Sequence, residues 1–519
     1  MYGGYPESLY NQLINPSPRI RSVLRQVLLL LLLTTSAMLV EGYHPGLEDD
    51  AFYLAAIKKN LNPALYPHDA DFFRVQFQAT IFDKLIAYSV RLTHLPVDWA
   101  AAAWHFVSIF LILWGCLRLS RLCFSETYAR WAAVVTVALL LSLPVTATGI
   151  TLVDQYLHPR TLATAAILGA IVATLEGRKL PAGVLLAIAV SLHALMAAFA
   201  ISYCIFLGWQ AAPVRRRATA AAIFFFFPLG WIFEPSSEAW RQAAATRPPF
   251  YRLAEWQWYE WLGVFAPLLL LWLFHRLAEH KGERALSRLT SRLVYFGIFQ
   301  CMVAMAMMLP PGLERLRPLE PMRFLHLCYL LLFLVAGGLI GQYILRNRWY
   351  RWLLLFVPLS LGMYYSQRQM YPATEHLELP GTAPKNAWVQ AFAWIRENTP
   401  QDSLFALGPY YMREAGEDYH GFRALAERSM LADSIKDGGM AARVPRLAER
   451  WRKEVDAQSG WTNFRVSDFE RLRRQFGVSW IVLASPGVPG MSCPYRNRLV
   501  LVCRLQDPAS QQTSAGPNL

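Results

Sequence analysis

Charged residues are scarce in this sequence of 519 residues. They make up 17% of the chain, whereas soluble globular proteins average about 25%. Hydrophobic residues make up 55%, and the mean hydropathy is positive. This composition excludes an ordinary cytosolic enzyme and predicts a membrane protein. The sequence also has no Gly-rich phosphate loop of the P-loop or dinucleotide type, which argues against a nucleotide-driven pump.

Cysteines are few, and most of them lie in apolar surroundings. Five of the seven fall in or beside hydrophobic runs, where a cysteine acts as a small packing residue; they are Cys116, Cys123, Cys204, Cys301 and Cys328. Cys493 and Cys503 differ, because they flank a predicted pair of strands near the C-terminus. An oxidising compartment would permit a disulfide there, and the sequence leaves open whether it forms.

Long apolar runs recur between residues 20 and 366, and runs of roughly 17 to 25 residues can cross a bilayer as helices. We predict eleven spans, which are Val23–Val40, Ala100–Cys123, Trp131–Ile150, Leu162–Leu175, Leu180–Leu192, Leu195–Trp209, Ala218–Phe233, Trp258–Phe274, Leu293–Leu309, Phe324–Leu345 and Trp352–Tyr365. The first span is expected to be an anchor and not a signal peptide, since no small-residue cleavage site follows it. The predicted fold class is an α-helical polytopic membrane protein.

The net charge of +14 first suggests a nucleic-acid partner. If the N-terminus is cytosolic and all eleven spans cross, however, the cytosolic loops hold 19 basic and 5 acidic residues and carry the whole excess. Basic loops on the cytosolic side are the usual orientation signal of membrane proteins. The charge therefore predicts topology, with an extracytoplasmic C-terminus, and no nucleic-acid partner.

Two extracytoplasmic regions stand out from the spans. Residues 1–366 are expected to form the membrane domain, and its first outside loop, residues 41–98, is too long for a simple connector. Two surface-lying amphipathic helices are predicted in this loop, Asp50–Asn60 and Phe72–Thr93. Residues 367–519 are expected to form a small extracytoplasmic α/β domain. Its predicted helices are Trp388–Asn398 and Val466–Phe476, and its predicted strands are Leu404–Leu407, Trp480–Ala484 and Leu499–Leu505.

The strongest local feature is the acidic cluster Glu48, Asp49 and Asp50, which follows the first span on the outside. Three adjacent carboxylates raise one another's proton affinity unless a cation, a metal or a substrate donor compensates. Such an arrangement suits a general base. Asp49 or Asp50 could instead cap the following helix, and the two roles can coexist.

A second polar group lies further along the same loop. His68, Asp69 and Asp71 could bind a divalent metal, position a sugar hydroxyl, or begin the second amphipathic helix. Their spacing matches no compact metalloprotease or zinc-finger motif, so a divalent cation stays an open possibility and no other cofactor is predicted.

Further polar residues lie at the outer ends of later spans. Asp154, His158 and Arg160 form a short loop, and the guanidinium of Arg160 suits a phosphate or pyrophosphate. His193 lies at the break between two spans, either as a packing residue or at a cavity rim. Arg323, at lipid headgroup depth, could snorkel or bind a lipid phosphate.

The architecture resembles the GT-C superfamily of membrane glycosyltransferases, which includes protein mannosyltransferases and the aminoarabinose transferase of lipid A. The likeness rests on the cytosolic N-terminus, the single span before a long acidic loop, the many later spans and the outside C-terminal domain. The stretches Gly-Tyr-His-Pro-Gly-Leu-Glu-Asp-Asp (42–50) and Leu-Asn-Pro-Ala-Leu-Tyr-Pro-His-Asp (61–69) also resemble uncharacterised bacterial GT-C-like membrane proteins.

The resemblance implies a polyprenyl-phosphate-linked sugar donor, an inverting transfer, and a first-loop Asp as base, a position that Asp49 or Asp50 matches. It also implies the bacterial inner membrane, with membrane lipids around the chain and a glycan, lipid or protein as acceptor. The Glu-Asp-Asp cluster departs from the Asp-Glu pair of protein mannosyltransferases, which leaves open which carboxylate is the base and whether a metal takes part.

Two other classes of function remain alternatives. A transporter or flippase for a lipid-linked sugar predicts ionisable residues in mid-span and Gly- or Pro-broken helices in matching halves, whereas the polar residues here gather at the outer rim. A non-catalytic protein that binds envelope glycans is the other alternative, and the intact acidic cluster makes it the weaker one.

Overall fold

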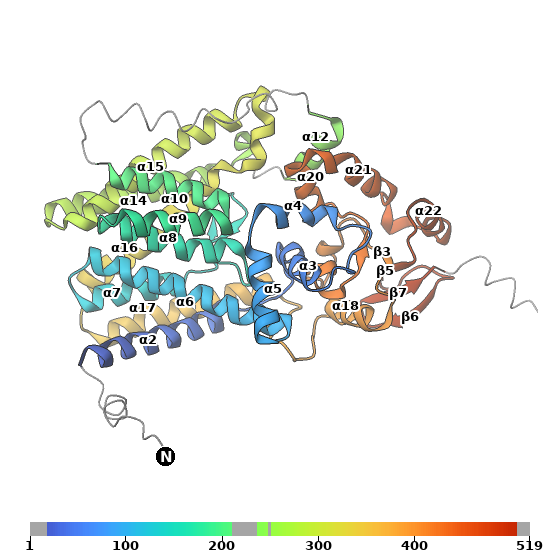
Figure 1. The fold of residues 1–519 in the computed structure, drawn as a ribbon, viewed down its shortest axis with the longest axis horizontal. Coiled ribbons are helices and arrows are strands. Elements are labelled where there is room, and N and C mark those ends of the chain that lie inside the picture. The colour runs from blue at the N-terminus through green and yellow to red at the C-terminus, as the bar shows by residue number, and fades with distance from the viewer. Residues whose placement is uncertain (1–17, 210–235, 248–250, 506–519) are drawn as a thin grey trace, which may run out of the picture.

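The computed structural model describes residues 18–209, 236–247 and 251–505. A bundle of long helices fills one half of the molecule, and the C-terminal region, residues 371–505, fills the other (Figure 1). The helices within residues 41–98 lie between the two halves. Residues far apart in the sequence therefore meet at the junction of the bundle and the C-terminal region.

Hydrophobic helices build the bundle. They are α2 (Pro18–Glu41), α6 (Val97–Cys123), α7 (Thr127–Ala138), α8 (Pro159–Leu175), α9 (Lys179–Leu192), α10 (Ala194–Gly208), α14 (Trp258–His280), α15 (Arg284–Met308), α16 (Leu325–Ile340) and α17 (Trp349–Met370). Within the described residues, five stretches are long and apolar enough to cross a membrane: Ile20–Glu41, Val97–Cys123, Trp258–His280, Arg284–Met308 and Pro321–Leu345. The helices α8, α9 and α10 are apolar but shorter.

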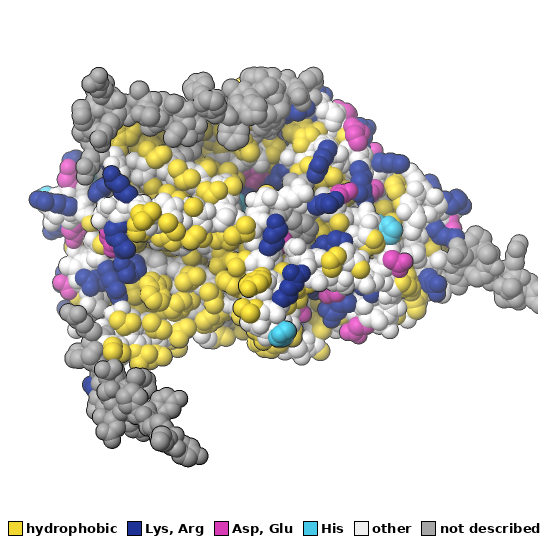
Figure 2. Space-filling model, viewed as in Figure 1, with side chains coloured by type: hydrophobic (Ala, Val, Ile, Leu, Met, Phe, Trp, Pro, Cys, Tyr) yellow, Lys and Arg dark blue, Asp and Glu magenta, His cyan; other side chains and the backbone are white. Residues whose placement is uncertain are grey.

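Apolar side chains also cover the outside of the bundle. Leu180 is 79% exposed, Trp349 is 74% exposed and Leu354 is 73% exposed. Figure 2 shows hydrophobic side chains spread over this half of the molecule, with Lys and Arg gathered at its far end. An exposed apolar surface of this extent is what lipid covers in a membrane protein.

One predicted span disagrees with the described structure in kind as well as in its limits. The expected span Trp131–Ile150 is too long, because α7 ends at Ala138 and the chain then forms the hairpin β1 (Pro144–Val145) and β2 (Ile150–Thr151). Pro144 has no N–H with which to continue a helix. The expected break at His193 is present between α9 and α10, and the expected span Ala218–Phe233 lies outside the described residues.

The segment between α2 and α6 contains three helices, α3 (Asp50–Leu61), α4 (Asp71–Ala79) and α5 (Phe82–Thr93). The prediction of surface-lying helices is wrong for α3, because every residue from Ala51 to Ile57 is buried. This helix packs against α5 on one side and against α19 (Phe422–Ala426) of the C-terminal region on the other. The second predicted helix is interrupted at Thr80, whose extended backbone ends α4.

The C-terminal region contains a five-stranded sheet with the order β4-β3-β5-β7-β6. Its strands are β3 (Leu404–Ala406), β4 (Ser429–Met430), β5 (Trp480–Ala484), β6 (Ser492–Arg496) and β7 (Val500–Arg504). The pairs of β3 with β4 and of β3 with β5 are parallel, and the remaining pairs are antiparallel. Cys493 in β6 and Cys503 in β7 form a disulfide.

Helices cover this sheet and connect its strands. They are α18 (Ala387–Asn398), α19, α20 (Lys436–Arg443), α21 (Ala448–Ala457) and α22 (Val466–Phe476). Apolar side chains pack on both faces of the sheet, Phe405 and Trp480 on one face and Leu404 and Ile481 on the other. Short helices complete the described structure: α12 (Glu238–Ala245), η4 (Leu253–Glu255), η5 (Pro311–Leu319), η6 (Pro321–Phe324), η7 (Gly341–Leu345), η8 (Tyr411–Arg413), η9 (Pro445–Leu447) and η10 (Trp461–Asn463).

Candidate active site

The acidic loop that follows α2 is held by backbone hydrogen bonds to the C-terminal region. The Gly421 N–H donates to the Gly46 carbonyl over 2.7 Å, and the Glu48 N–H donates to the Tyr419 carbonyl over 2.9 Å. Gly42 has a φ of +90°, and a Cβ there would lie 2.9 Å from the His376 carbonyl oxygen. Only glycine fits this backbone conformation and this close approach. The loop is therefore fixed at the junction before any ligand binds.

The three carboxylates of the acidic cluster point in two directions. Glu48 and Asp49 both contact the ammonium of Lys436 from α20, with 2.8 Å between Asp49 Oδ1 and Lys436 Nζ. Asp50 turns the other way, is 3% exposed, and accepts a 2.6 Å hydrogen bond from the Gly46 N–H. Asp49 occupies the N-cap position of α3, but its side chain makes no capping hydrogen bond. The Asp49 carboxylate is thus available to a ligand, whereas Asp50 serves the loop itself.

These positions give the two aspartates opposite pKa shifts. Burial favours the neutral form of Asp49, but the positive charges of Lys436 and Arg443 outweigh burial and hold the pKa of Asp49 well below its usual range. Burial raises the pKa of Asp50 to about 7 with help from the charges of Asp98 and Asp154, against the Gly46 N–H and the charge of Lys58. Lys436 is the compensating cation for the acidic cluster, so Asp49 is ionised at neutral pH.

Two cavities meet at Asp49. The smaller has a volume of about 350 Å³ and lies between the bundle and α20. The larger has a volume of about 860 Å³ and extends between the bundle's outer loops and the C-terminal region. Three residues, Asp49, Arg323 and Arg443, line both cavities. A group bound in one cavity would therefore lie beside a group bound in the other.

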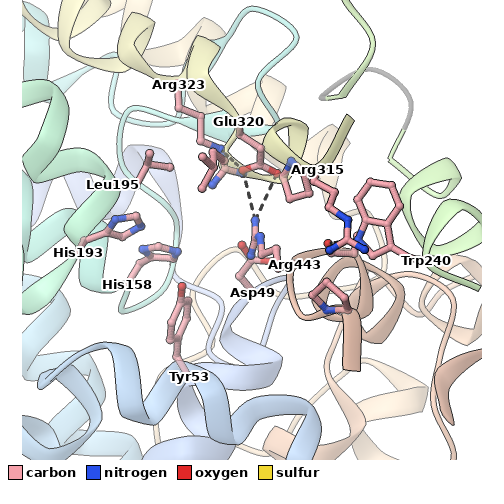
Figure 3. Close-up of a pocket in the computed structure, with 14 residues that line it drawn as sticks. Asp49, Tyr53, His158, His193, Leu195, Trp240, Arg315, Glu320, Arg323 and Arg443 are labelled. Carbon is pink, nitrogen blue, oxygen red and sulfur yellow. Dashed lines mark hydrogen bonds and ion pairs between the residues drawn. The ribbon is translucent and has the colours of Figure 1, made fainter. Parts of the chain in front are cut away.

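Arginines gather around one buried carboxylate in the smaller cavity (Figure 3). Glu320 is 4% exposed, and its Oε2 lies 2.7 Å from Arg323 Nε and 3.3 Å from an Arg443 Nη2. Arg315 lines the same cavity. The single carboxylate of Glu320 fixes the positions of two guanidiniums, and the surplus of guanidinium donors suits a phosphate group.

Two neutral histidines form another wall of the smaller cavity. His158 caps α8, and its Nδ1 accepts a 2.9 Å hydrogen bond from the Arg160 N–H. His193 caps α10 through a 3.4 Å hydrogen bond from the Met196 N–H. Burial, helped by the charge of Arg160, lowers the pKa of His158 well below its usual range and that of His193 to about 3. With Nδ1 as an acceptor, each ring carries its proton on Nε2 and can donate it to a ligand.

The larger cavity is strongly basic. It is lined by three carboxylates, Glu48, Asp49 and Asp154, and by six basic side chains, Arg160, Arg247, Arg323, Arg413, Arg443 and Lys436. Arg160 is committed to Asp154, because its Nη2 lies 2.6 Å from both carboxylate oxygens. Burial raises the pKa of Asp154, and the Arg160 charge opposes that rise. The remaining basic excess favours an anionic ligand.

The residues at positions 68–71 lie outside both cavities. His68 Nε2 is 2.9 Å from the Asp402 carbonyl oxygen, and Asp71 is exposed and pairs with Arg450. Asp69 is completely buried, where it accepts hydrogen bonds from Arg423 Nε over 2.5 Å and from the Met430 N–H over 3.0 Å. These residues connect the first loop to the C-terminal region and do not contact the cavities.

Sequence reasoning did not identify the residues that α20 contributes. Lys436 and Arg443 are seven residues apart, two helical turns, so they share one face. Gly439 lies between them on that face, and a Cβ there would be 2.1 Å from an Arg247 nitrogen. The signal in the sequence was a basic residue at each end of a glycine-containing helix. The pairing of Lys436 with Asp49 could not be inferred, because the two residues are 387 positions apart in the sequence.

A divalent cation does not fit the acidic cluster as it is arranged. No group of three or more His, Cys, Asp or Glu side chains that could hold a metal occurs in the described parts of the chain. The ammonium of Lys436 lies between Glu48 and Asp49, where a bridging cation would otherwise bind. We therefore derive no chemical step through a metal ion.

No family model matches this chain, and no curated protein matches it either. Among solved structures, it is similar to archaeal oligosaccharyltransferase AglB from Archaeoglobus fulgidus, in complex with an inhibitory peptide and a dolichol-phosphate. The identity is 12%, the TM-score is 0.47, and the match covers 88% of this chain and 69% of that one.

A second structure is that of the Archaeoglobus fulgidus oligosaccharyltransferase in complex with Zn and sulfate, at 12% identity and a TM-score of 0.36. It covers 88% of this chain and 67% of that one. A likeness this distant leaves the function of this chain to its own residues.

Proposed function

We propose that this protein is a membrane glycosyltransferase that transfers a sugar from a polyprenyl-phosphate-linked donor to an extracytoplasmic acceptor. The position of Asp49 supports the proposal most strongly, because its ionised carboxylate lies on the wall common to both cavities. One substrate can occupy each cavity, with the reacting atoms meeting at Asp49. This arrangement suits a displacement between two bound molecules.

The donor phosphate is assigned to the smaller cavity. Arg323 and Arg443 line it together with apolar residues of the bundle side, Leu195 and Leu319. Guanidiniums stabilise the charge that develops on a departing phosphate. Leu195 and Leu319 are suited to the first part of a lipid chain, and the Nε2–H groups of His158 and His193 can donate to sugar or phosphate oxygens.

The acceptor is assigned to the larger cavity, which the C-terminal region lines. Asp49 accepts a hydrogen bond from the acceptor's nucleophilic group and takes its proton as that group attacks the anomeric carbon. The bond from the anomeric carbon to the phosphate oxygen breaks, its electron pair leaves with the phosphate, and the configuration inverts. Because the pKa of Asp49 is low, proton transfer comes late, when the bound nucleophile has become acidic.

The test is Asp49→Asn, with Asp71→Asn as the matched control because Asp71 is exposed outside both cavities. Envelope glycans and lipid-linked sugars are measured by mass spectrometry in a deletion strain carrying each variant. Asp49→Asn is expected to lower transfer about 10² to 10⁴-fold, with loss of one glycan and accumulation of its donor on the outer face. Undiminished transfer at a normal membrane level would count against the assignment. Donor confined to the cytosolic face of the deletion strain would indicate a flippase instead.

A further inference from the structure

A third cavity, of about 210 Å³, lies within the C-terminal region and shares no lining residue with the two cavities at Asp49. It is lined by Gly408, which follows β3, and by the segment from Ala484 to Val488, where β5 ends. The cavity is thus at the carboxyl ends of two adjacent parallel strands. Nothing in the proposed transfer uses it.

The connections of the sheet diverge at this place. After β3 the chain crosses to β4 on one side, and after β5 it continues to β6 and β7 on the other side. Where the connections of neighbouring parallel strands leave in opposite directions, a crevice forms outside their carboxyl ends, and ligands of open α/β sheets bind there. The third cavity occupies that position between β3 and β5.

Aromatic rings form the walls of this cavity, contributed by Trp388, Tyr411 and Trp461. The Trp461 indole lies directly against the backbone, because a Cβ on Gly408 would be 3.0 Å from Trp461 Cδ1. Phe464 and Phe469 hold that indole from behind, with ring centroids 5.4 Å and 5.3 Å away. The rings are positioned by the fold and not by a ligand.

Polar groups of three lining residues have no partner within the part of the chain that the structure describes. Trp388 is 2% exposed, and its buried indole N–H makes no hydrogen bond there. The Glu414 carboxylate and the Trp461 N–H also have no hydrogen bond or ion pair among the described residues. A ligand that both accepts and donates hydrogen bonds can pair with the Trp461 N–H and the Glu414 carboxylate.

We propose that the third cavity binds one ring of a neutral sugar. The C–H face of a sugar ring packs on an aromatic ring, and its hydroxyls can accept from the Trp461 N–H and donate to Glu414. The volume of the third cavity is below the roughly 300 to 1,000 Å³ of pockets for drug-sized ligands. The occupant is therefore limited to a group about the size of one sugar ring. An apolar peptide side chain would leave Glu414 and the Trp461 N–H unpaired. The site stands independently of glycosyl transfer at Asp49.

The test uses the full chain in lipid nanodiscs free of sugar-based detergent. Saturation-transfer NMR is recorded with D-glucose, D-galactose, D-mannose and N-acetyl-D-glucosamine, each at millimolar concentration. At least one sugar is expected to bind, and Trp461→Ala and Glu414→Gln are each expected to weaken that binding about tenfold or more. Trp349→Ala is the matched control, because this indole is 74% exposed on α17 and far from the sheet.

Asp49→Asn separates this site from the catalytic cavities. Sugar binding that survives Asp49→Asn and is lost in Glu414→Gln supports the third cavity. Binding that is kept in both Trp461→Ala and Glu414→Gln places the sugar elsewhere and overturns the proposal, whether or not Asp49→Asn abolishes it. Absence of binding by all four sugars overturns it as well. Glu414→Gln retains the shape of the side chain, so its result does not depend on how Trp461→Ala folds.

Discussion

The ammonium of Lys436 lies 2.8 Å from Asp49 Oδ1 and joins the C-terminal region to the acidic loop that follows α2. Lys436 is 4% exposed, whereas 32% of the Asp49 side chain remains accessible. The lysine is enclosed, and the aspartate faces the cavities. The C-terminal region therefore supplies the charge that keeps the proposed base ionised.

Lys436→Met is expected to move the acid limb of the transfer rate to higher pH. Without the ammonium, burial becomes the dominant influence, and the pKa of Asp49 rises toward neutrality. The rate needs ionised Asp49, so it should fall more in mildly acidic than in mildly alkaline buffer. The measurement is the pH profile of transfer in membranes. Lys385→Met is the control, because Lys385 is 77% exposed and pairs with Glu375, away from Asp49. An unchanged acid limb in Lys436→Met would contradict the proposed role.

Asp50→Asn is expected to keep activity and to flatten the pH dependence of stability. The pKa of Asp50 is about 7 in the folded protein and about 3.9 in an unfolded chain. A raised carboxyl pKa means that stability is greatest below the unfolded value and decreases as the pH rises toward the folded value. Asparagine still accepts from the Gly46 N–H and carries no charge. Thermal unfolding midpoints across this pH window test the prediction, and an unchanged slope would argue that Asp50 does not titrate there.

Arg443→Gln is expected to lower the rate of transfer about 10² to 10³-fold. Removing one hydrogen-bond donor that stabilises a developing negative charge has an effect of this size in other enzymes. The guanidinium lies on the wall common to both cavities and is held by Glu320. Single-turnover rates with a purified lipid-linked donor measure the effect. Arg446→Gln, three residues further along and exposed, is the control. Equal rates in the two variants would remove Arg443 from the phosphate site.

Asp69→Ala is expected to destabilise the protein by about 3 to 5 kcal/mol, the usual result of removing one partner from a buried ion pair. Asp69 is fully buried and holds Arg423, which is also bound by Asp437. The measurement is thermal unfolding of the purified chain. Asp71→Ala, whose side chain is 58% exposed, should change stability little. Similar midpoints in the two variants would mean that the buried network is not needed to dock the first loop.

Local elements of the C-terminal region follow closely from sequence pattern. The predicted strand Trp480–Ala484 and the predicted helix Val466–Phe476 coincide with β5 and α22. Continuous apolar runs and 3.6-residue periodicity encode such elements locally. The end of α7 could not be predicted from local pattern, because the chain turns into the β1–β2 hairpin there. The burial of α3 could not be predicted either, because it depends on packing against α5 and α19.

Candidate site residues divide in the same way. Six predicted residues each line at least one of the two cavities, although they come from separate segments: Asp49, Asp154, His158, Arg160, His193 and Arg323. His68, Asp69 and Asp71 have comparable chemistry but lie outside them. Residue type and a place at the outer end of a span could not separate the two sets, since the separation depends on which way each backbone turns.

The sequence by itself determined that the chain is rich in apolar helices, that its polar residues gather beside their ends, and that three carboxylates stand together at positions 48–50. Those properties reside in neighbouring residues. Only the tertiary structure decided that Asp49 faces the cavities, that Asp50 faces its own loop, and that Lys436 fixes the charge of Asp49. A pKa and a cavity wall depend on groups brought together through space, so no local pattern could have specified them.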